Sequence, residues 1–288
     1  MRNLILPVAV LLAASPAFAN ELTNGRITVD FATGGGTQTM DRVDAISWID
    51  SDGVSTGNLA VAGGGVNCGD PQEFFGQAYS DLDGGTPLFI VQGSQAKWKP
   101  KGDAQGTSKA NGKDDCLTLN GKTTSVYTLG GSSKLESAMK IERTFTFGTD
   151  GSANLRAYAP RVSMSVYATV VYANGAGDIQ TFPITNCPFA TASGCEISDW
   201  NGKWVADEDS AGAGVVLIRD KSSKWPAEIA ADFDSFSASN VTAIILMRPE
   251  AGWTGKVKET EYLCFYDAKS WTAKSRAKGK LPDGCQVK

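Results

Sequence analysis

Histidine is absent from this 288-residue chain, and its absence narrows the chemistry that the protein can perform. Ser-His-Asp and Cys-His catalysis use an imidazole as general base, and imidazole is the usual proton carrier near neutral pH. Histidine is also the commonest ligand of transition metals. Any enzyme built from this chain must therefore use carboxylates, tyrosine, lysine, arginine or an oxygen-bound metal.

Signatures of nucleotide and nucleic-acid binding are also missing. Glycine-rich stretches, such as residues 34–36 and 63–65, are triplets and not the G-x-G-x-x-G pattern that opens a helix. The chain has 27 basic and 31 acidic side chains, and this net charge of −4 argues against non-specific binding to nucleic acid. We expect neither nucleotide chemistry nor a nucleic-acid partner.

Metal-binding patterns are weak. The cysteines have no C-x-x-C spacing, so we expect no zinc site. Segments 50–53, 81–84 and 150–154 bring Asp oxygens close together, but none has the residue order of an EF-hand loop. Because Asp-Gly is first of all a turn signal, we predict turns there and no cofactor, with calcium as the alternative.

A long apolar run occurs at the N-terminus, and it has the features of a signal peptide. Arg2 precedes an apolar stretch over residues 4–14, and residues 17–19 (AFA) form an A-x-A cleavage site. A membrane-spanning helix needs about 20 apolar residues, which no stretch provides. We predict a signal peptide over residues 1–19, a single domain over residues 20–288, no membrane span, and a periplasmic or secreted location.

The cysteine count agrees with export. Six cysteines follow the predicted cleavage site: Cys68, Cys116, Cys187, Cys195, Cys264 and Cys285. An even number in an exported chain favours disulfides, although sequence alone leaves the connectivity open. Order and distance along the chain favour Cys68–Cys116, Cys187–Cys195 and Cys264–Cys285. Each bond is expected to stabilise the fold by about 2–4 kcal/mol.

Strand signals dominate the remaining sequence. Residues 26–31 and 140–147 alternate polar and apolar side chains, residues 163–172 are rich in β-branched and aromatic types, and residues 215–219 and 241–247 are short apolar runs. Glycine pairs and triplets separate these segments as turns. We predict an all-β fold, a large antiparallel β-sandwich stapled by disulfides.

Two segments are expected to depart from this pattern. Residues 225–233 are predicted to hold one or two helical turns. Residues 99–115 are polar and rich in Lys, Gly, Asp and Ser, so we predict a mobile excursion there.

Three short motifs resemble the galactose-mutarotase-like β-supersandwich. Residues 22–29 (LTNGRITV) are similar to the opening strand of such domains. Residues 199–204 (DWNGKW) and 204–209 (WVADED), followed by 212–218 (GAGVVLI), resemble a tryptophan-bearing strand, a glycine-rich turn and a strand reading GVGLL. The resemblance is spread over residues 22–268, and an immunoglobulin-like two-domain sandwich or a jelly roll are the alternatives.

The resemblance implies sugar chemistry: epimerisation, polysaccharide lysis, or an accessory role without catalysis. Mutarotases of this fold pair a histidine acid with a carboxylate base, and this chain has no histidine. We therefore do not expect mutarotase activity. Several lyases of this architecture use tyrosine as the base, with asparagine or arginine neutralising the uronate.

The first candidate site is an aromatic and acidic segment. Sugar sites stack flat aromatic faces on pyranose rings and bind hydroxyls with carboxylates. Because Trp200 and Trp204 have the same parity, a regular strand would point both to one face. A core role for both tryptophans is the alternative. The predicted ligand-binding residues are Asp199, Trp200, Trp204 and Asp207, together with Glu73 and Tyr79 from an aromatic loop after Cys68.

The second candidate site is catalytic. Nearby guanidinium groups favour the charged form of a tyrosine and bind a substrate carboxylate. The residues that fit this description are Tyr158, Arg156, Arg161 and Asn186. A surface strand with these side chains turned to solvent is the alternative.

These observations rank three functions. The first is an exported carbohydrate-recognising protein that binds a glycan or polysaccharide through aromatic and carboxylate residues. The second is an enzyme, either a Tyr/Arg-dependent polysaccharide lyase or a carboxylate-pair glycosidase. The third is an envelope protein that holds a partner by a sheet edge or an apolar patch. Fold analogy alone establishes none of them.

Overall fold

The computed structural model describes residues 21–31, 43–56, 77–79, 99–111, 121–147, 157–159, 161–163, 169–182, 197–223, 228–237, 240–248 and 256–287. These residues form strands β1 to β17 and one short helix, α1. No helix within these ranges is long and apolar enough to span a bilayer.

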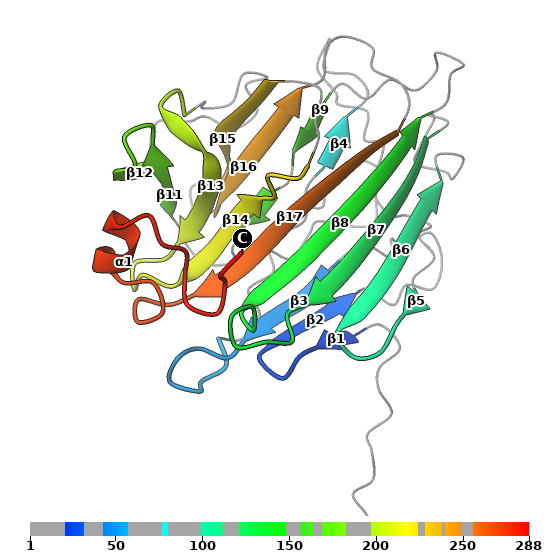
Figure 1. The fold of residues 1–288 in the computed structure, drawn as a ribbon, viewed down its shortest axis with the longest axis horizontal. Helices are drawn as coiled ribbons and strands as arrows, with labels where there is room; N and C mark the ends of the chain where they lie inside the picture. Colours follow the sequence, from blue (N-terminus) through cyan, green and yellow to red (C-terminus); the bar gives the residue numbers. More distant parts are fainter. Residues whose placement is uncertain are drawn as a thin grey trace, which may run out of the picture.

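A nine-stranded antiparallel sheet is the centre of the molecule (Figure 1). Its strand order is β12-β11-β13-β14-β17-β8-β7-β6-β5. The strands are β5 (Lys99–Pro100), β6 (Gln105–Asn111), β7 (Gly121–Leu129), β8 (Ala138–Phe147), β11 (Thr169–Asn174), β12 (Ile179–Phe182), β13 (Trp200–Glu208), β14 (Gly214–Arg219) and β17 (Lys256–Tyr266).

Two smaller antiparallel sheets pack against one side of it, which we call the inner face. The three-stranded sheet contains β1 (Glu21–Thr23), β2 (Ile27–Phe31) and β3 (Val43–Trp48). The five-stranded sheet contains β4 (Gln77–Tyr79), β9 (Ala157–Ala159), β10 (Arg161–Ser163), β15 (Glu228–Ser237) and β16 (Asn240–Arg248). Strands β15 and β16 contact β13, and β10 contacts β14. The side chain of Asn24 holds the three-stranded sheet in place by donating to the carbonyl oxygens of Gly130 (2.7 Å) and Glu136 (3.0 Å).

Side chains of the large sheet alternate between the inner face and the opposite, outer face, as the two-residue period of a strand requires. Ile141, Leu217 and Leu263 are on the inner face and are almost completely buried. The outer face is apolar over β13 and β14 and at the ends of β8 and β17 that hold Ala138 and Cys264, and it is polar over the rest of β8 and β17. This alternation lets one pair of strands carry two different sets of side chains.

The C-terminal segment, residues 267–287, covers the apolar part of the outer face. It includes α1 (Ala273–Ala277), whose N-cap is Thr272. Trp271 is 1% exposed and packs beside Cys264, Tyr266 and Cys285. A disulfide joins Cys264 in β17 to Cys285, which confirms one of the predicted pairings. The other four cysteines lie outside the described residues.

The predicted all-β, antiparallel architecture is confirmed. Two local predictions are wrong. Residues 228–237 form strand β15 and not helical turns, because they pair with β16 along its length. Residues 105–111, predicted to be part of a mobile excursion, form β6. Its polar residues fit a strand near the end of a sheet, and its partner β7 supplies the backbone hydrogen bonds.

Candidate functional site

In the structure, two residues of the predicted aromatic and acidic segment are buried and two are accessible. Trp204 is 5% exposed and lies in the outer-face core, with its ring edge-on to Trp271 at 4.9 Å between centroids. Asp207 is completely buried. By contrast, Trp200 is half-buried and Asp199 is exposed. This burial favours a core role for Trp204 and Asp207 and leaves Asp199 and Trp200 as residues that a ligand can contact.

The strand between the two tryptophans is irregular. Trp200 pairs with Asn174 and Val205 pairs with Tyr172, so the register shifts between them. Gly202 has a φ of 80°, which few side-chain-bearing residues adopt. The indole nitrogen of Trp200 donates to the carbonyl oxygen of Trp204 at 2.8 Å. Strand β13 is therefore not regular between Trp200 and Trp204, and their even spacing does not place them on one face.

Asp199 has a well-defined partner. The hydroxyl of Tyr172 donates to its Oδ1 at 2.8 Å. Burial of the phenol, together with the neighbouring Asp199 carboxylate, raises the pKa of Tyr172 to about 12. This tyrosine is therefore a hydrogen-bond donor at neutral pH, and it orients Asp199.

Other predicted site residues are only partly placed. Glu73, Arg156 and Asn186 lie outside the described residues. Tyr79, Tyr158 and Arg161 are described only by their backbone. Tyr158 pairs with both Ala78 of β4 and Met247 of β16, and Arg161 pairs with Ile244 of β16. The topology therefore brings these three residues into one sheet, and their proposed chemistry stays a prediction.

Four charged side chains that sequence reasoning missed lie together on the inner face. They are Arg143 of β8, Arg219 of β14, and Glu259 and Glu261 of β17; we call them the inner charge cluster. Arg143 Nη1 donates to Glu261 Oε2 at 3.0 Å, and Arg219 Nε donates to Glu259 Oε1 at 2.7 Å. Both glutamates are 0% exposed, and Arg143 is 5% exposed.

The strand register explains this arrangement. β17 lies between β8 and β14, so its glutamates reach arginines on both sides. Arg143 is opposite Glu259 and Arg219 is opposite Glu261. Each arginine nevertheless bonds the glutamate diagonal to it. Each side chain in the cluster therefore has two neighbours of the other charge type, one directly across the strand pair and one on the diagonal.

Glu259 has an unusual acidity for a glutamate. Burial, supported by the negative charge of Glu261, raises the pKa of Glu259 to about 8, although Arg219 opposes the shift. Near neutral pH the cluster therefore contains a protonated carboxyl group beside a second glutamate. A buried carboxyl group whose pKa is raised towards neutrality is one element of acid–base catalysis.

The sequence did contain a signal for this cluster. In residues 257–263 (VKETEYL), the glutamates have the same parity as the apolar Val257 and Leu263. Arg143 likewise falls between Ile141 and Phe145 on the apolar face of its strand. Charged residues that share the parity of apolar neighbours predict buried ion pairs.

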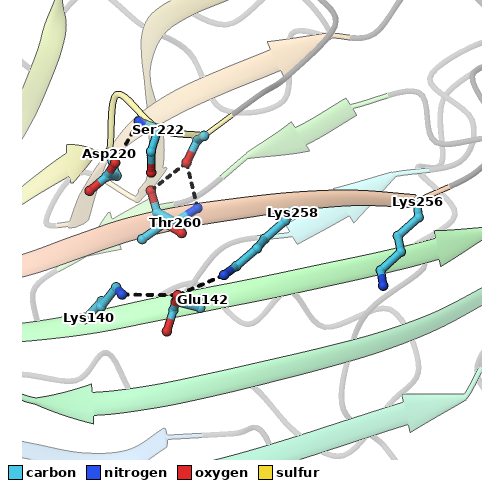
Figure 2. A pocket seen from close by; sticks show the side chains of 8 residues that line it. Lys140, Glu142, Asp220, Ser222, Lys256, Lys258 and Thr260 are labelled. Carbon is cyan, nitrogen blue, oxygen red and sulfur yellow. Dashed lines mark hydrogen bonds and ion pairs between the residues drawn. The ribbon is translucent and has the colours of Figure 1, made fainter.

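A polar hollow of about 460 Å³ lies on the outer face of strands β8 and β17 (Figure 2). We call it the outer hollow. Its lining residues are Lys140 and Glu142 from β8, Lys256, Lys258 and Thr260 from β17, and Asp220, Ser222 and Ser223 from the turn after β14. Glu142 Oε1 lies 3.1 Å from both Lys140 Nζ and Lys258 Nζ. These lysines lower the pKa of Glu142 despite the opposing effect of partial burial, so it is ionised near neutral pH.

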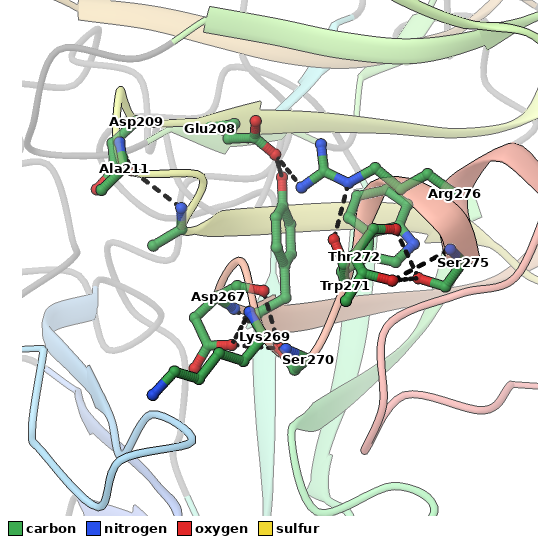
Figure 3. A network of polar contacts seen from close by, with 12 residues as sticks. Glu208, Asp209, Ala211, Asp267, Lys269, Ser270, Trp271, Thr272, Ser275 and Arg276 are labelled. Atoms are coloured by element: carbon green, nitrogen blue, oxygen red, sulfur yellow. Dashed lines mark hydrogen bonds and ion pairs between the residues drawn. The ribbon is translucent and has the colours of Figure 1, made fainter.

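Under the C-terminal segment, the charged side chains of the outer face bond to other groups of the protein (Figure 3). Arg276 of α1 lies over the Trp271 ring at 4.4 Å and forms an ion pair with Glu208 at 2.5 Å. The Tyr266 hydroxyl donates to the same carboxylate at 3.0 Å. These contacts fasten the C-terminal segment to the sheet.

Residues 50–53, for which a turn was predicted with calcium as the alternative, form a turn. Oδ1 of Asp50 accepts from the backbone nitrogens of Asp52 and Val54, both at 2.9 Å. Asp52 forms an ion pair with Lys269. Among the described residues, no group of three or more His, Cys, Asp or Glu side chains is arranged to hold a metal ion. The segments at 81–84 and 150–154 lie outside those residues.

Comparison with known proteins identifies similar folds. No protein-family model matches the chain, and no curated protein matches its sequence. A putative aldose 1-epimerase from Escherichia coli K12 matches with a TM-score of 0.52 at 9% identity, over 86% of this chain and 98% of that one. The α-N-acetylgalactosaminidase NagBb from Bifidobacterium bifidum, in complex with GalNAc, matches with a TM-score of 0.53 at 12% identity, over 91% of this chain.

The chain spans 39% of the length of that glycosidase. Both similarities extend over most of the present chain, and they confirm the predicted galactose-mutarotase-like β-supersandwich as the fold. At these identities they concern the fold alone.

Proposed function

We propose that the protein is exported and recognises a glycan by binding it. The observation that carries this proposal is the similarity in fold to an aldose 1-epimerase over 98% of that enzyme's chain. The glycosidase of similar fold, whose complex contains GalNAc, adds support. The Cys264–Cys285 disulfide is typical of proteins outside the cytoplasm and supports export. The signal peptide over residues 1–19 and a single domain over residues 20–288 are part of the proposal.

Burial of the inner charge cluster favours binding over catalysis. A general acid must come within about 2.6–3.2 Å of the atom that it protonates, directly or through one water. Glu259 and Glu261 are both 0% exposed, and each is bonded to an arginine. A substrate therefore has no direct access to either carboxyl group in this conformation.

Asp199 and Trp200 are the proposed glycan contacts among the described side chains. Trp200 is half-buried at the start of β13, and Asp199 beside it is exposed and oriented by Tyr172. An aromatic ring next to a carboxylate suits a sugar, because the ring packs on C–H groups while the carboxylate accepts hydroxyl hydrogens. Glu73 and Tyr79 remain proposed contacts.

A glycan-array screen of the oxidised protein without residues 1–19 tests this function. We expect binding to at least one glycan, and we expect Trp200→Ala and Asp199→Ala to weaken it. Asp178→Ala is a matched control, since Asp178 is also exposed and lies in the turn between β11 and β12. Thermal melts of all variants separate lost binding from lost folding. No binding by the wild-type protein to any glycan would contradict the proposal.

A carboxylate-pair enzyme is the second candidate. The observation that favours it is the pKa of Glu259, raised to about 8 by burial and by Glu261, close to a second glutamate on the same strand. Release of reducing ends from a bound glycan tests hydrolysis. New ultraviolet absorbance from an unsaturated uronate tests the lyase proposed for Tyr158 and Arg161. Turnover that disappears in Glu259→Gln would favour the enzyme.

A further inference from the structure

The outer hollow has a rigid wall. The turn at residues 220–223 is tied to β17, because the Asp220 backbone nitrogen donates to the carbonyl oxygen of Thr260 at 2.9 Å. Ser223 Oγ donates to the same carbonyl oxygen at 3.1 Å and accepts from the Thr260 nitrogen at 2.8 Å. Arg219 Nη2 donates to the Ser223 carbonyl oxygen at 3.1 Å. The wall therefore keeps its shape without a ligand.

Charge in the hollow is opposite in sign to that of the whole chain. Three lysines and two carboxylates line it, which leaves one excess positive charge, whereas the chain carries −4. Glu142 is shared between Lys140 and Lys258. The Asp220 carboxylate is already hydrogen-bonded within its own turn, since its Oδ1 accepts from the Ser222 backbone nitrogen at 2.7 Å. Lys256 is exposed, and it forms no ion pair with any of the described residues. The unbalanced charge therefore lies at Lys256, and Lys258 lies two residues further along the same strand.

We propose that the outer hollow binds the anionic group of an acidic sugar, a carboxylate or sulfate on a hydroxyl-bearing ring. Lys256 and Lys258 contact the anion, and the exposed Ser222 hydroxyl bonds to the ring. This assignment rests on the proposed function and names the class of glycan. A volume of about 460 Å³ lies within the range of small-ligand sites, about 300–1,000 Å³.

Two features favour an acidic sugar over other ligands. Compact lysine ammonium groups suit anionic oxygens, which a neutral sugar lacks. Glu142 and Asp220 line the same hollow, and their carboxylates need hydroxyl donors, which a DNA backbone lacks between its phosphates. A sugar with one anionic group and several hydroxyls fits this mixed lining, because carboxylates accept hydrogen bonds from hydroxyls.

Isothermal titration with four probes tests the assignment: oligogalacturonate, a heparin oligosaccharide, neutral maltohexaose and a single-stranded DNA oligonucleotide. We expect Lys256→Gln with Lys258→Gln to weaken binding of the anionic sugar about fivefold to tenfold, since each exposed charge pair contributes modestly. The matched control is Lys274→Gln with Lys278→Gln, two exposed lysines of the C-terminal segment, which should change affinity by less than about twofold.

Glu142→Gln provides the opposite test. This variant removes the carboxylate that Lys140 and Lys258 share, so both ammonium groups become available to the ligand. We expect it to strengthen binding of the anionic sugar about twofold to fivefold. Strengthened binding of oligogalacturonate, which has carboxylates and no sulfate, identifies a carboxylate as the anion. Strengthened binding of the heparin oligosaccharide alone, which has both groups, shows that a sulfate is required.

Three results would overturn the assignment. One is a loss of affinity in the control variant, Lys274→Gln with Lys278→Gln, that equals the loss in Lys256→Gln with Lys258→Gln. Another is weaker binding in Glu142→Gln. A third is binding of the DNA oligonucleotide as tightly as either acidic sugar. Binding of neutral glycans alone would overturn the acidic-sugar site and leave the proposed function standing, whereas no binding to any glycan would refute both.

Discussion

Strands β8 and β17 carry the same kinds of charged side chain on both faces, with opposite consequences. On the inner face, Arg143 and Glu261 form an ion pair with side chains 6% and 1% exposed. On the outer face, Lys258 and Glu142 form one with side chains 63% and 25% exposed. The N–O distances are almost the same, 3.0 and 3.1 Å. Burial and not geometry therefore decides what each pair does.

The difference assigns the two faces different roles. A buried charge that loses its partner is strongly destabilising, because its desolvation is no longer offset. An exposed pair contributes little to stability and is screened by salt. We infer that the inner charges hold the strands in register, while the outer charges are free to exchange a partner for a ligand.

Arg143→Met should show the largest effect. The substitution removes the buried guanidinium group that donates to Glu261, and we expect the free energy of unfolding to fall by about 3–5 kcal/mol. Urea denaturation followed by tryptophan fluorescence measures the change. A loss below about 1 kcal/mol would place the inner pair in the same class as the outer one and remove the distinction between the faces.

Removal of the Cys264–Cys285 disulfide comes second. The bond closes a loop with a sequence separation of 21 and holds the segment that covers the apolar part of the outer face. We expect the double alanine variant to lose about 3 kcal/mol. Calorimetry of the oxidised variant and wild type measures it. An unchanged melting temperature would mean that Trp271 and Arg276 hold the segment without the bond.

Glu259→Gln should change the pH dependence of stability. The folded protein holds this proton more tightly than the unfolded chain does, because the pKa of Glu259 is raised from 4.5 to about 8. Its stabilising contribution is complete below about pH 4.5 and is lost as pH rises through about 8. Relative to the variant, the wild type should lose about 2 kcal/mol between pH 5 and pH 7. A pH-independent difference would mean that Glu259 titrates normally.

Lys258→Met on the outer face should have the smallest effect. Its ammonium group is bonded to Glu142 but is largely exposed, so we expect the free energy of unfolding to change by less than about 1 kcal/mol. The same urea experiment measures it, beside Arg143→Met. A loss as large as that of the inner variant would contradict the assignment of the outer charges to ligand binding.

Much of the fold could be predicted from local patterns. Alternation over residues 140–147 and the apolar run at 215–219 correspond to β8 and β14, because both signals depend on neighbours in sequence. β15 was missed because its conformation depends on pairing with β16. Trp204 could not be assigned to the core before the segment around Trp271 was seen to cover it.

The candidate sites depend even more on long-range contacts. Parity alone indicates that Glu259, Glu261 and Arg143 are buried, but the partners of the two glutamates are 40 and 118 residues away in sequence. The outer hollow combines β8, β17 and the turn at 220–223. Only strand order and register bring such segments together, and neither is encoded in a local pattern.

The affinity of Glu259→Gln for the glycan that the wild type binds is the most direct test of the central claim. Glutamine matches the shape of the protonated acid, so the variant should fold as the wild type does. We predict an affinity within about twofold of the wild-type value, because the ligand contacts exposed residues and not the inner charge cluster. Loss of binding in a variant with an unchanged melting temperature would place the ligand at the inner face and contradict the account.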